Sequence, residues 1–245
     1  MMELKRVINV KGCPRLAVAF ISLALLSLLA ALPGCGKGEP TLEEIWEKSM
    51  EAQDNITSLH MEIAIFYQNT KFGSGQIQTY TVDVSGNNVH LQNSIFGHTF
   101  SEVIVVGGKQ YSRAMGEKKW QEQPVSLTAQ SATEQVRGFS DLPTVASTKE
   151  SKGLEKVGGK DCYHLYFGLA PGEISKVFSS VPVSSLSAAA GADIDVWVEK
   201  ETNYRIKYEA LIRNVLIEEK IGYGDVRIVT TITEINQPIS ISPPS

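Results

Sequence analysis

The sequence predicts an α+β fold: a strongly curved antiparallel β-sheet, or half-barrel, with an N-terminal helix and helical inserts covering its concave face. Three observations predict it. From residue 59 onward, many segments alternate apolar and polar side chains with a period of two, which is typical of strands with one buried face. Short turns, several rich in Gly, join successive segments, and one amphipathic helix precedes them. A large, twisted sheet tends to curl, which leaves its inner face for helices to cover.

Residues 1–34 have the pattern of an export signal. Four basic residues and one acid precede an uncharged, apolar run over residues 16–32. A basic start followed by an apolar run is typical of a secretory signal peptide. The run is slightly short for the roughly 20 apolar residues that a transmembrane helix needs. A single uncleaved membrane span is therefore the second interpretation.

The apolar run ends at Leu32-Pro33-Gly34-Cys35, which resembles the lipobox of bacterial lipoproteins, although Pro33 departs from its usual small or aliphatic residues. In that family the cysteine receives a diacylglycerol and becomes the first residue of the mature chain. The resemblance implies that Cys35 is the lipid attachment site and that residues 35–40 are a short tether. The protein would then be exported and anchored on the extracytoplasmic side of the cell membrane, since two acyl chains give stable attachment. The alternative is an ordinary signal peptide with a chance cysteine.

The composition of the mature chain excludes one class of partner. Without residues 1–34 the chain carries 19 basic and 26 acidic residues, whereas nucleic-acid binding needs dense positive charge. We therefore expect no nucleic-acid partner. Cys162 is the only cysteine after Cys35, so no internal disulfide forms and the hydrophobic core must stabilise the fold. Residues 41–245 are predicted to form a single domain, because no long linker divides them.

The first predicted element is a helix that begins at Thr41. Thr41 and Glu44 have the spacing of a capping box, in which each side chain binds the other's backbone amide. Apolar residues then recur at a spacing close to three or four and give one buried face. They are Leu42, Ile45, Trp46, Met50, Ile56 and Leu59. We expect this helix to pack on the sheet that follows.

The predicted strands follow one another along the chain and are mostly joined by short turns. Their ranges are 59–67, 76–84, 88–92, 102–106, 109–114, 154–157, 161–167, 193–200, 204–212 and 225–235. Gly107-Gly108 is a strong signal for a hairpin turn, and Gly158-Gly159 also lies between two strands. In 204–212 the alternation places Ile206 and Tyr208 on one side of the sheet and Arg205 on the other.

Two stretches interrupt the strands. Residues 127–140 are predicted to form a short helix with Leu127, Val136 and Phe139 facing inward. Residues 172–191 are predicted to form a helix followed by a loop of small residues, because Pro182 breaks a helix. The second insert has few large side chains, so its local opening is expected to cost little free energy.

No segment carries a catalytic or metal-binding pattern. None of the four histidines belongs to a metal-binding motif. Cys162 and His164 share one side of a strand, but two ligands do not make a metal site. We therefore expect no enzyme activity, no metal and no cofactor. An enzyme with an unrecognised site is kept as the third hypothesis of function.

Four segments together carry a resemblance to a known family. They are the lipobox at Cys35, VIVVGGKQYSRAMGEKKW (103–120), DVWVEKETNYRIKYE (195–209) and EINQPISISPP (234–244). The second is similar to the family's strand, Gly-rich turn and Tyr strand followed by Trp. The third is similar to its Trp-Val-Asp strand, with Glu199 where Asp is usual. Through these segments the chain resembles the LppX/LprG-type lipoproteins of the LolA-like half-barrel superfamily.

The resemblance implies lipid handling. In that family a curved sheet and helices enclose an apolar cavity that takes acyl chains, and the protein moves its cargo across an aqueous gap. Acyl chains in water cost about 0.8 kcal/mol per methylene, so a carrier needs a dry apolar slot. The implied partners are a lipid or acylated cargo, the membrane and a membrane transport protein.

The alternating apolar residues are the candidates for lining this cavity. They are Ile63, Ile65, Val105, Tyr163, Leu165, Phe167, Val196, Val198, Ile206 and Tyr208, with Val177, Phe178 and Val181 as a lid. Plain core packing against the first helix is the competing interpretation for each. The second hypothesis of function is an envelope sensor or interaction module, in which side chains fill the slot and a protein partner binds instead of lipid.

Overall fold

The computed structural model describes residues 39–137, 139–178, 186, 188–220 and 222–244. The predicted signal peptide and the predicted lipid site at Cys35 lie outside the described residues. Residues Thr41–Ser245 form one compact unit. In the part of the chain that the structure describes, both hydrophobic clusters draw only on residues from Leu42 onward. This unit therefore contains its own core.

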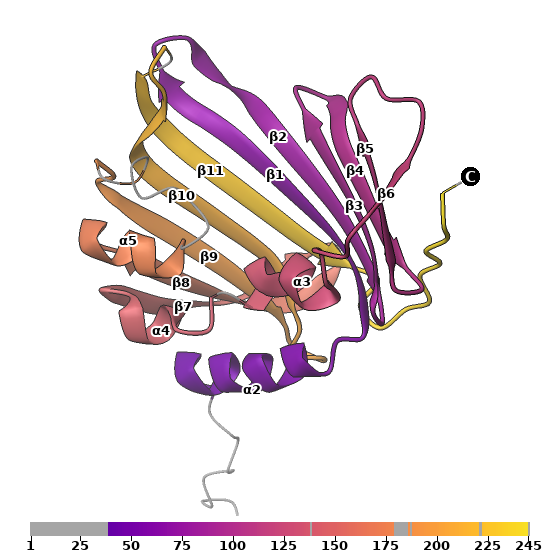
Figure 1. Cartoon of the computed structure of the whole chain (residues 1–245). Coiled ribbons are helices and arrows are strands. Elements are labelled where there is room, and N and C mark those ends of the chain that lie inside the picture. The colour runs from indigo at the N-terminus through magenta and orange to yellow at the C-terminus, as the bar shows by residue number, and fades with distance from the viewer. Residues whose placement is uncertain (1–38, 138, 179–185, 187, 221, 245) are drawn as a thin grey trace, which may run out of the picture. The chain divides into compact units, whose positions relative to one another are not determined.

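The described residues form one antiparallel sheet of eleven strands, which Figure 1 shows as a single curved layer. The spatial order is β6-β5-β4-β3-β2-β1-β11-β10-β9-β8-β7, so the first and last strands pair in the middle of the sheet. This confirms the predicted fold class. The strands are β1 (Ser58–Thr70), β2 (Gly73–Ser85), β3 (Asn88–Ile95), β4 (His98–Val106), β5 (Lys109–Ala114), β6 (Gln121–Gln123), β7 (Thr148–Val157), β8 (Lys160–Leu169), β9 (Gly191–Glu199), β10 (Arg205–Glu218) and β11 (Gly222–Thr233).

Helix α2 (Leu42–Asp54) begins with the predicted capping box. The Thr41 amide donates to the Glu44 carboxylate at 2.9 Å, and the Glu44 amide donates to the Thr41 hydroxyl at 3.2 Å. Its buried face includes Trp46, whose ring packs edge-on against Phe167 of β8 with centroids 5.1 Å apart. The helix is shorter than the apolar spacing predicted, because it ends at Asp54 and Leu59 already belongs to β1.

The inserts supply three short helices on the concave side of the sheet (Figure 1). They are α3 (Ala129–Arg137), α4 (Leu142–Val145) and α5 (Pro171–Val177). The predicted helix over 127–140 is wrong at its C-terminal end, because α3 ends at Arg137 and α4 begins only at Leu142. The predicted helix in the second insert is confirmed as α5, whereas Val181 and Pro182 lie outside the described residues.

The sheet has two ends of different character. We call the end that holds the β1–β2, β3–β4, β5–β6 and β10–β11 turns the hairpin end. The opposite end, where the β2–β3, β4–β5 and β7–β8 turns and α2 lie, is the helix end (Figure 1). The C-terminal tail closes the helix end, because the Asn236 side chain accepts from the Thr57 amide at 2.8 Å and donates to the Asn55 carbonyl at 3.2 Å.

A register shift in β10, between Arg205 and Lys207, changes which side chains face inward. A bulge adds one residue to a strand and interrupts its alternation. Arg205 is fully buried and contacts α2, so its predicted place on the outer side is wrong. Ile206 packs with Cys162 and Trp197 in a separate cluster, so its predicted place on the same side as Tyr208 is also wrong.

Candidate functional site

The concave face carries a continuous apolar row along β1, made of Leu59, Met61, Ile63 and Ile65. These residues alternate along the strand and therefore share one side of the sheet. The first three are buried and Ile65 is half-buried. Ile228 of β11 lies directly opposite Ile65 and widens the apolar surface. We call these four side chains of β1 the apolar row.

Most of the predicted cavity-lining residues lie inside the main hydrophobic cluster. Ile63, Val105, Leu165, Phe167, Phe178, Val196, Val198 and Tyr208 are buried in it, and Ile65, Tyr163 and Val177 are partly buried against it. Over β8, β9 and β10 this face is filled by protein side chains, including Phe139, whose ring lies 5.3 Å from that of Tyr208. A ligand-binding role for these residues stays a prediction.

Over β1 to β4 and β11 the helices cover the concave face only in part. Six apolar side chains of the concave face pack against the main cluster there but remain partly exposed. We call this set the apolar strip: Ile65, Tyr80, Leu91, Val103, Val226 and Ile228. Leu91 and Val103 lie opposite each other across β3 and β4, as Ile65 and Ile228 do across β1 and β11. The apolar row thus runs from buried core into an apolar surface that is still accessible.

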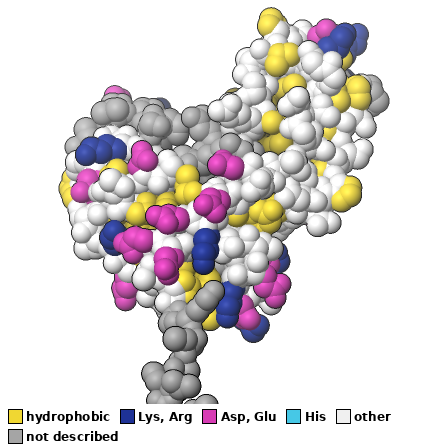
Figure 2. All heavy atoms as spheres, turned by 90° about the horizontal axis from the view of Figure 1, so that it is seen from below, with side chains coloured by type: hydrophobic (Ala, Val, Ile, Leu, Met, Phe, Trp, Pro, Cys, Tyr) yellow, Lys and Arg dark blue, Asp and Glu magenta, His cyan; other side chains and the backbone are white. Residues whose placement is uncertain are grey.

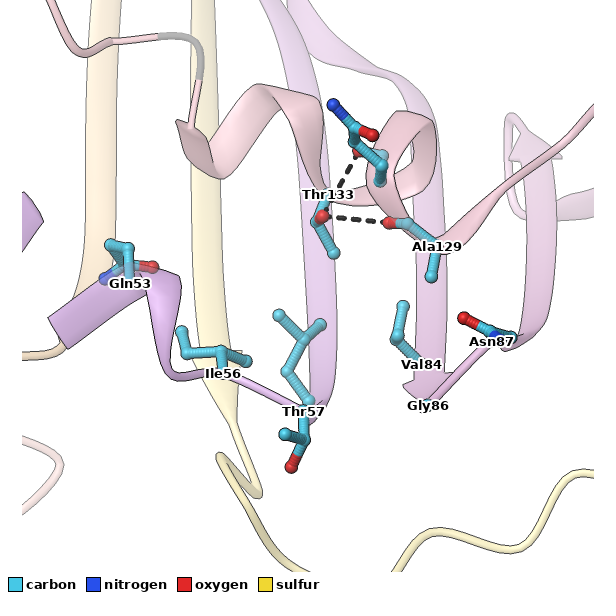
Figure 3. Close-up of a pocket in the computed structure, with 10 residues that line it drawn as sticks. Gln53, Ile56, Thr57, Val84, Gly86, Asn87, Ala129 and Thr133 are labelled. Atoms are coloured by element: carbon cyan, nitrogen blue, oxygen red, sulfur yellow. Dashed lines mark hydrogen bonds between the residues drawn. The ribbon is translucent and has the colours of Figure 1, made fainter. Parts of the chain in front are cut away.

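A pocket of about 310 Å³ lies at the helix end of the same face (Figure 3). The end of α2, the link to β1, the β2–β3 turn and the first turns of α3 enclose it. Leu59 belongs both to its wall and to the apolar row, so the pocket adjoins that row. Its volume is at the lower limit of typical small-molecule pockets. The lining residues are Gln53, Ile56, Thr57, Leu59, Val84, Gly86, Asn87, Ala129, Gln130 and Thr133.

None of the predicted lining residues borders this pocket. Its walls come from a helix end, a turn and an insert, which are far apart in the sequence, so strand alternation could not find them. Only Ile56 and Leu59 had a sequence signal, as members of the predicted helix face. The Thr133 hydroxyl is already used within α3, where it donates to the Ala129 carbonyl at 2.8 Å (Figure 3).

Gln53 gives the pocket an unmatched polar group. Gln53 is 3% exposed, and neither its Nε2 nor its Oε1 has a hydrogen-bond partner in the described part of the chain. A buried amide without partners costs about 1–3 kcal/mol. Gln53 lines the pocket, but both of its amide atoms are buried beneath the pocket surface.

Arg205 is the second buried polar group beneath α2. Its Nε donates to the Ser49 hydroxyl at 3.0 Å, and its guanidinium lies 4.2 Å from the centre of the Trp46 ring. Its Nη1 has no partner among the described residues, and within them no carboxylate forms an ion pair with it. Burial raises the pKa of the nearby Tyr208 hydroxyl, and the positive charge of Arg205 opposes this rise.

The convex face holds the titratable clusters. His60, Asp83, His90, Glu102 and Arg113 form a chain of polar contacts across β1 to β5, ending with Arg113 Nη2 at 2.6 Å from Glu102. Burial favours a raised pKa of Glu102, but hydrogen bonds from His90 and Arg113 outweigh it and lower that pKa. Among the described residues no group of three His, Cys, Asp or Glu side chains is arranged to hold a metal ion.

The Cys162 thiol lies in the small hydrophobic cluster, apart from the pocket and the apolar strip. Burial raises the pKa of the Cys162 thiol, which packs in the small cluster with Trp197 and Ile206. A thiol with a raised pKa is a poor nucleophile. Of the helices that the structure describes, none is long and apolar enough to cross a membrane.

The geometry defines a class of protein: an open half-barrel whose apolar concave face is partly covered by short helices. Two crystal structures with this architecture are those of the Mycobacterium tuberculosis lipoprotein LppX and of LprF from Mycobacterium bovis. The chain is 11% identical to LppX, with a TM-score of 0.50 over 82% of this chain and 100% of LppX. It is 15% identical to LprF, with a TM-score of 0.50 over 85% of this chain and 100% of LprF.

These similarities show the fold. The resemblance to LppX-type half-barrels that the sequence motifs predicted is therefore confirmed for the architecture. No protein-family model matches the chain, and no curated protein matches its sequence.

Proposed function

We propose that this protein is a membrane-anchored lipoprotein that binds lipid or acyl chains on its concave face and carries them within the cell envelope. The apolar row of β1 is the observation that carries the proposal. It begins at Leu59 in the wall of the pocket and ends at Ile65 in the partly exposed apolar strip. An acyl chain laid on the partly exposed apolar strip would leave water for an apolar surface, which contributes about 0.8 kcal/mol per methylene, while the buried Leu59, Met61 and Ile63 support that surface from the core.

The pocket supports the same proposal. A lipid has one polar end and one apolar end, and the pocket wall holds polar residues such as Asn87 and Gln130 beside apolar ones such as Ile56. The polar end would lie in the pocket, while the chain lies on the apolar strip. No catalytic step is part of the proposal, because binding and release of cargo need no covalent chemistry.

The anchor is proposed at Cys35, with residues 1–34 removed on export. The lipobox-like sequence Leu32-Pro33-Gly34-Cys35 supports it, and LppX, which shares the architecture, is a lipoprotein. The protein would then lie on the extracytoplasmic side of the membrane, where its partners are the lipid cargo and a membrane transport protein. Intact mass spectrometry tests the anchor: the mature chain is expected to start at Cys35 with an added diacylglycerol, and Cys35→Ser is expected to lack it.

Cargo binding is tested in two steps. Native mass spectrometry of the gently extracted protein is expected to show a bound lipid, and a fluorescent fatty acid is expected to compete with it. Ile65→Asn places a polar group on the apolar strip and is expected to weaken probe binding about tenfold. The neighbouring Phe66→Asn changes the convex face of the same strand and is the matched control.

The pocket has its own pair of variants. Ala129→Phe fills the pocket from its α3 side, whereas Ala64→Phe adds the same ring on the convex face of β1. Probe binding is expected to fall in the first and to stay within about twofold of the parent in the second. The proposal is wrong if no lipid copurifies and the parent takes up no probe, or if both variants of a pair behave alike.

A further inference from the structure

Five large apolar side chains are exposed at the hairpin end of the sheet. We call them the apolar rim: Phe72, Phe96, Phe100, Met115 and Tyr223. The exposed fractions of Phe72, Phe96 and Met115 are 69%, 67% and 63%. None of the five belongs to either hydrophobic cluster of the described residues. Elsewhere in the described part of the chain, only Val125 and Leu154 are large apolar side chains with comparable exposure.

The rim residues do not serve the fold. Phe96 occupies the β3–β4 turn with φ of 48°, a left-handed conformation that is costly for a bulky residue. Asn or Gly is the preferred residue at such a turn position. A strained and exposed phenylalanine therefore lowers stability without packing against anything in the described core. Backbone outliers of this kind are a reason to look for a function.

The two ends of the sheet differ in the side chains that their turns expose. At the helix end the β2–β3, β4–β5 and β7–β8 turns are Gly86-Asn87, Gly107-Gly108 and Gly158-Gly159, with no aromatic side chain. The helix end also carries the exposed acidic side of α2, and Figure 2, which views the molecule from this end, shows Asp and Glu side chains gathered there. The β9–β10 turn, also at the helix end, carries Tyr204, which packs against the small hydrophobic cluster. Among these described hairpins, exposed apolar turn tips therefore occur at the hairpin end.

Lysines accompany the apolar tips. Lys71 precedes Phe72, and its ammonium lies 5.0 Å from the centre of that ring. Glu117, Lys118 and Lys119 follow Met115 in the β5–β6 turn, which leaves one net positive charge there. Lys220 stands near Tyr223, although Glu219 balances its charge. Aromatic rings beside lysines are typical of surfaces that enter a membrane interface and meet anionic lipid head groups.

We propose that the hairpin end docks on a lipid bilayer that contains anionic lipid, with the apolar rim inserted at the interface. The tips belong to separate turns, and those of β1–β2 and β5–β6 are about 20 Å apart at a strand spacing of about 4.8 Å. A bilayer accepts several separate tips at once, whereas a protein partner needs a contiguous complementary surface. This contact is distinct from the anchor at Cys35 and does not depend on lipid cargo.

The test uses the unit Thr41–Ser245, which contains the described core and lacks Cys35, so that no acyl anchor contributes. Binding is measured by cosedimentation with phosphatidylcholine vesicles containing about 30% phosphatidylglycerol. The variant Phe72→Ser/Phe96→Ser/Met115→Ser removes three tips. The control Val125→Ser/Leu154→Ser removes two other exposed apolar side chains, each 48% exposed. Circular dichroism verifies that both variants keep the fold, as expected for residues outside the core.

The parent unit is expected to bind the vesicles, and the three-tip variant is expected to bind about 100-fold more weakly, at about fivefold per side chain. The control is expected to stay within about twofold of the parent. Added salt should weaken binding but not abolish it, because insertion of apolar side chains is not screened. The proposal is overturned if the parent does not bind, if the control loses as much as the three-tip variant, or if salt alone abolishes binding.

Two further measurements distinguish insertion of the rim into a bilayer from dimerisation through the rim. An environment-sensitive fluorophore attached through Phe72→Cys is expected to shift to the blue on vesicles, whereas one attached through Leu154→Cys is not. Cys162 is fully buried and resists labelling. If analytical ultracentrifugation instead shows that the parent dimerises through the rim and the vesicles leave the fluorophore unchanged, the rim binds a second copy of the chain and the bilayer proposal is wrong.

Discussion

Replacing Arg205 by Met is expected to leave the stability of the protein almost unchanged, although Arg205 is among the most deeply buried residues of the chain. Its guanidinium is charged, is fully buried and has no carboxylate partner among the described residues. Its Nη1 is unpaired within the same residues. The arginine therefore carries a desolvation cost that its contacts must offset.

The expected magnitude follows from the contacts that the substitution removes. The charge-assisted bond to Ser49 is worth about 2 kcal/mol, and the cation–π contact with Trp46 about 2 kcal/mol in a desolvated site. The substitution also removes the contact of Nη2 with Met50 Sδ and the hydrogen bond with Tyr208. Against these losses stands the penalty of burying one unpaired charge, which is several kcal/mol. Met keeps most of the apolar stem and gains about 1 kcal/mol from sulfur–aromatic contact. We therefore expect Arg205→Met to lie within about 1 kcal/mol of the parent.

Two further substitutions separate charge from packing. Arg205→Ala removes the stem as well and leaves a cavity under Trp46, so it is expected to lose about 3 kcal/mol. Arg213→Met in the same strand is the matched control, because Arg213 is exposed and its ion pair with Asp193 contributes under about 1 kcal/mol. Urea unfolding followed by circular dichroism and tryptophan fluorescence measures all three. A loss of 3 kcal/mol or more in Arg205→Met would refute the reasoning, because it would mean that the buried charge is compensated.

The remaining predictions concern the tail, the pocket and acid stability. Asn236→Ala is expected to lower the free energy of unfolding by about 2 kcal/mol, because the Asn236 amide links the tail to Asn55 and Thr57 and the residue has a φ of 56°. Asn236→Gly can adopt this φ without strain. An equal loss in Asn236→Gly therefore assigns the effect to the hydrogen bonds. Gln53→Leu is expected to raise the free energy of unfolding by about 1 kcal/mol, because it removes an unpaired buried amide; an unchanged melting temperature would contradict this. The lowered pKa of Glu102 stabilises the fold above its ordinary value of 4.5, and this stabilisation is lost as pH falls through the lower folded value. Glu102→Gln is therefore expected to lower stability at pH 7 and to flatten its decline between roughly pH 5 and pH 3, whereas the exposed Glu47→Gln should keep the parent's slope.

Hairpins and caps could be predicted from the sequence because their signals are local. The capping box of Thr41 and Glu44 needs only residues three apart, and Gly107-Gly108 specifies a tight turn because both residues have positive φ. From such turns the order of neighbouring strands follows directly. The pairing of β1 with β11 could not be predicted in this way, since nothing local links the two ends of the chain.

The bulge in β10 shows where alternation fails. One additional residue between Arg205 and Lys207 turns Arg205 inward and moves Ile206 to the other cluster. A prediction from alternation assumes an unbroken period of two. The cost of burying a guanidinium also favours an exposed Arg205, so both arguments predicted the wrong side of the sheet. The sequence signal that was missed is Trp46 on α2, an aromatic face suited to an arginine but 159 positions away.

Most of the side chains that were predicted to line a cavity lie in the core on the concave side of the sheet, and their role in binding stays a prediction. Alternation reports which side chains share a face, whereas the inserts decide how much of that face stays open. Here α2, α4 and α5 contact or lie over the strands around β8 and β9, which buries Leu165 and Phe167, and the partly exposed side chains lie on β1 to β4 and β11. A cargo site is therefore expected where the inserts end, between the pocket beside Gln53 and the apolar strip. The same reasoning applies to the rim: Phe96 interrupts a turn that Asn or Gly would normally occupy, and such local misfits in the sequence locate surfaces that the core does not explain.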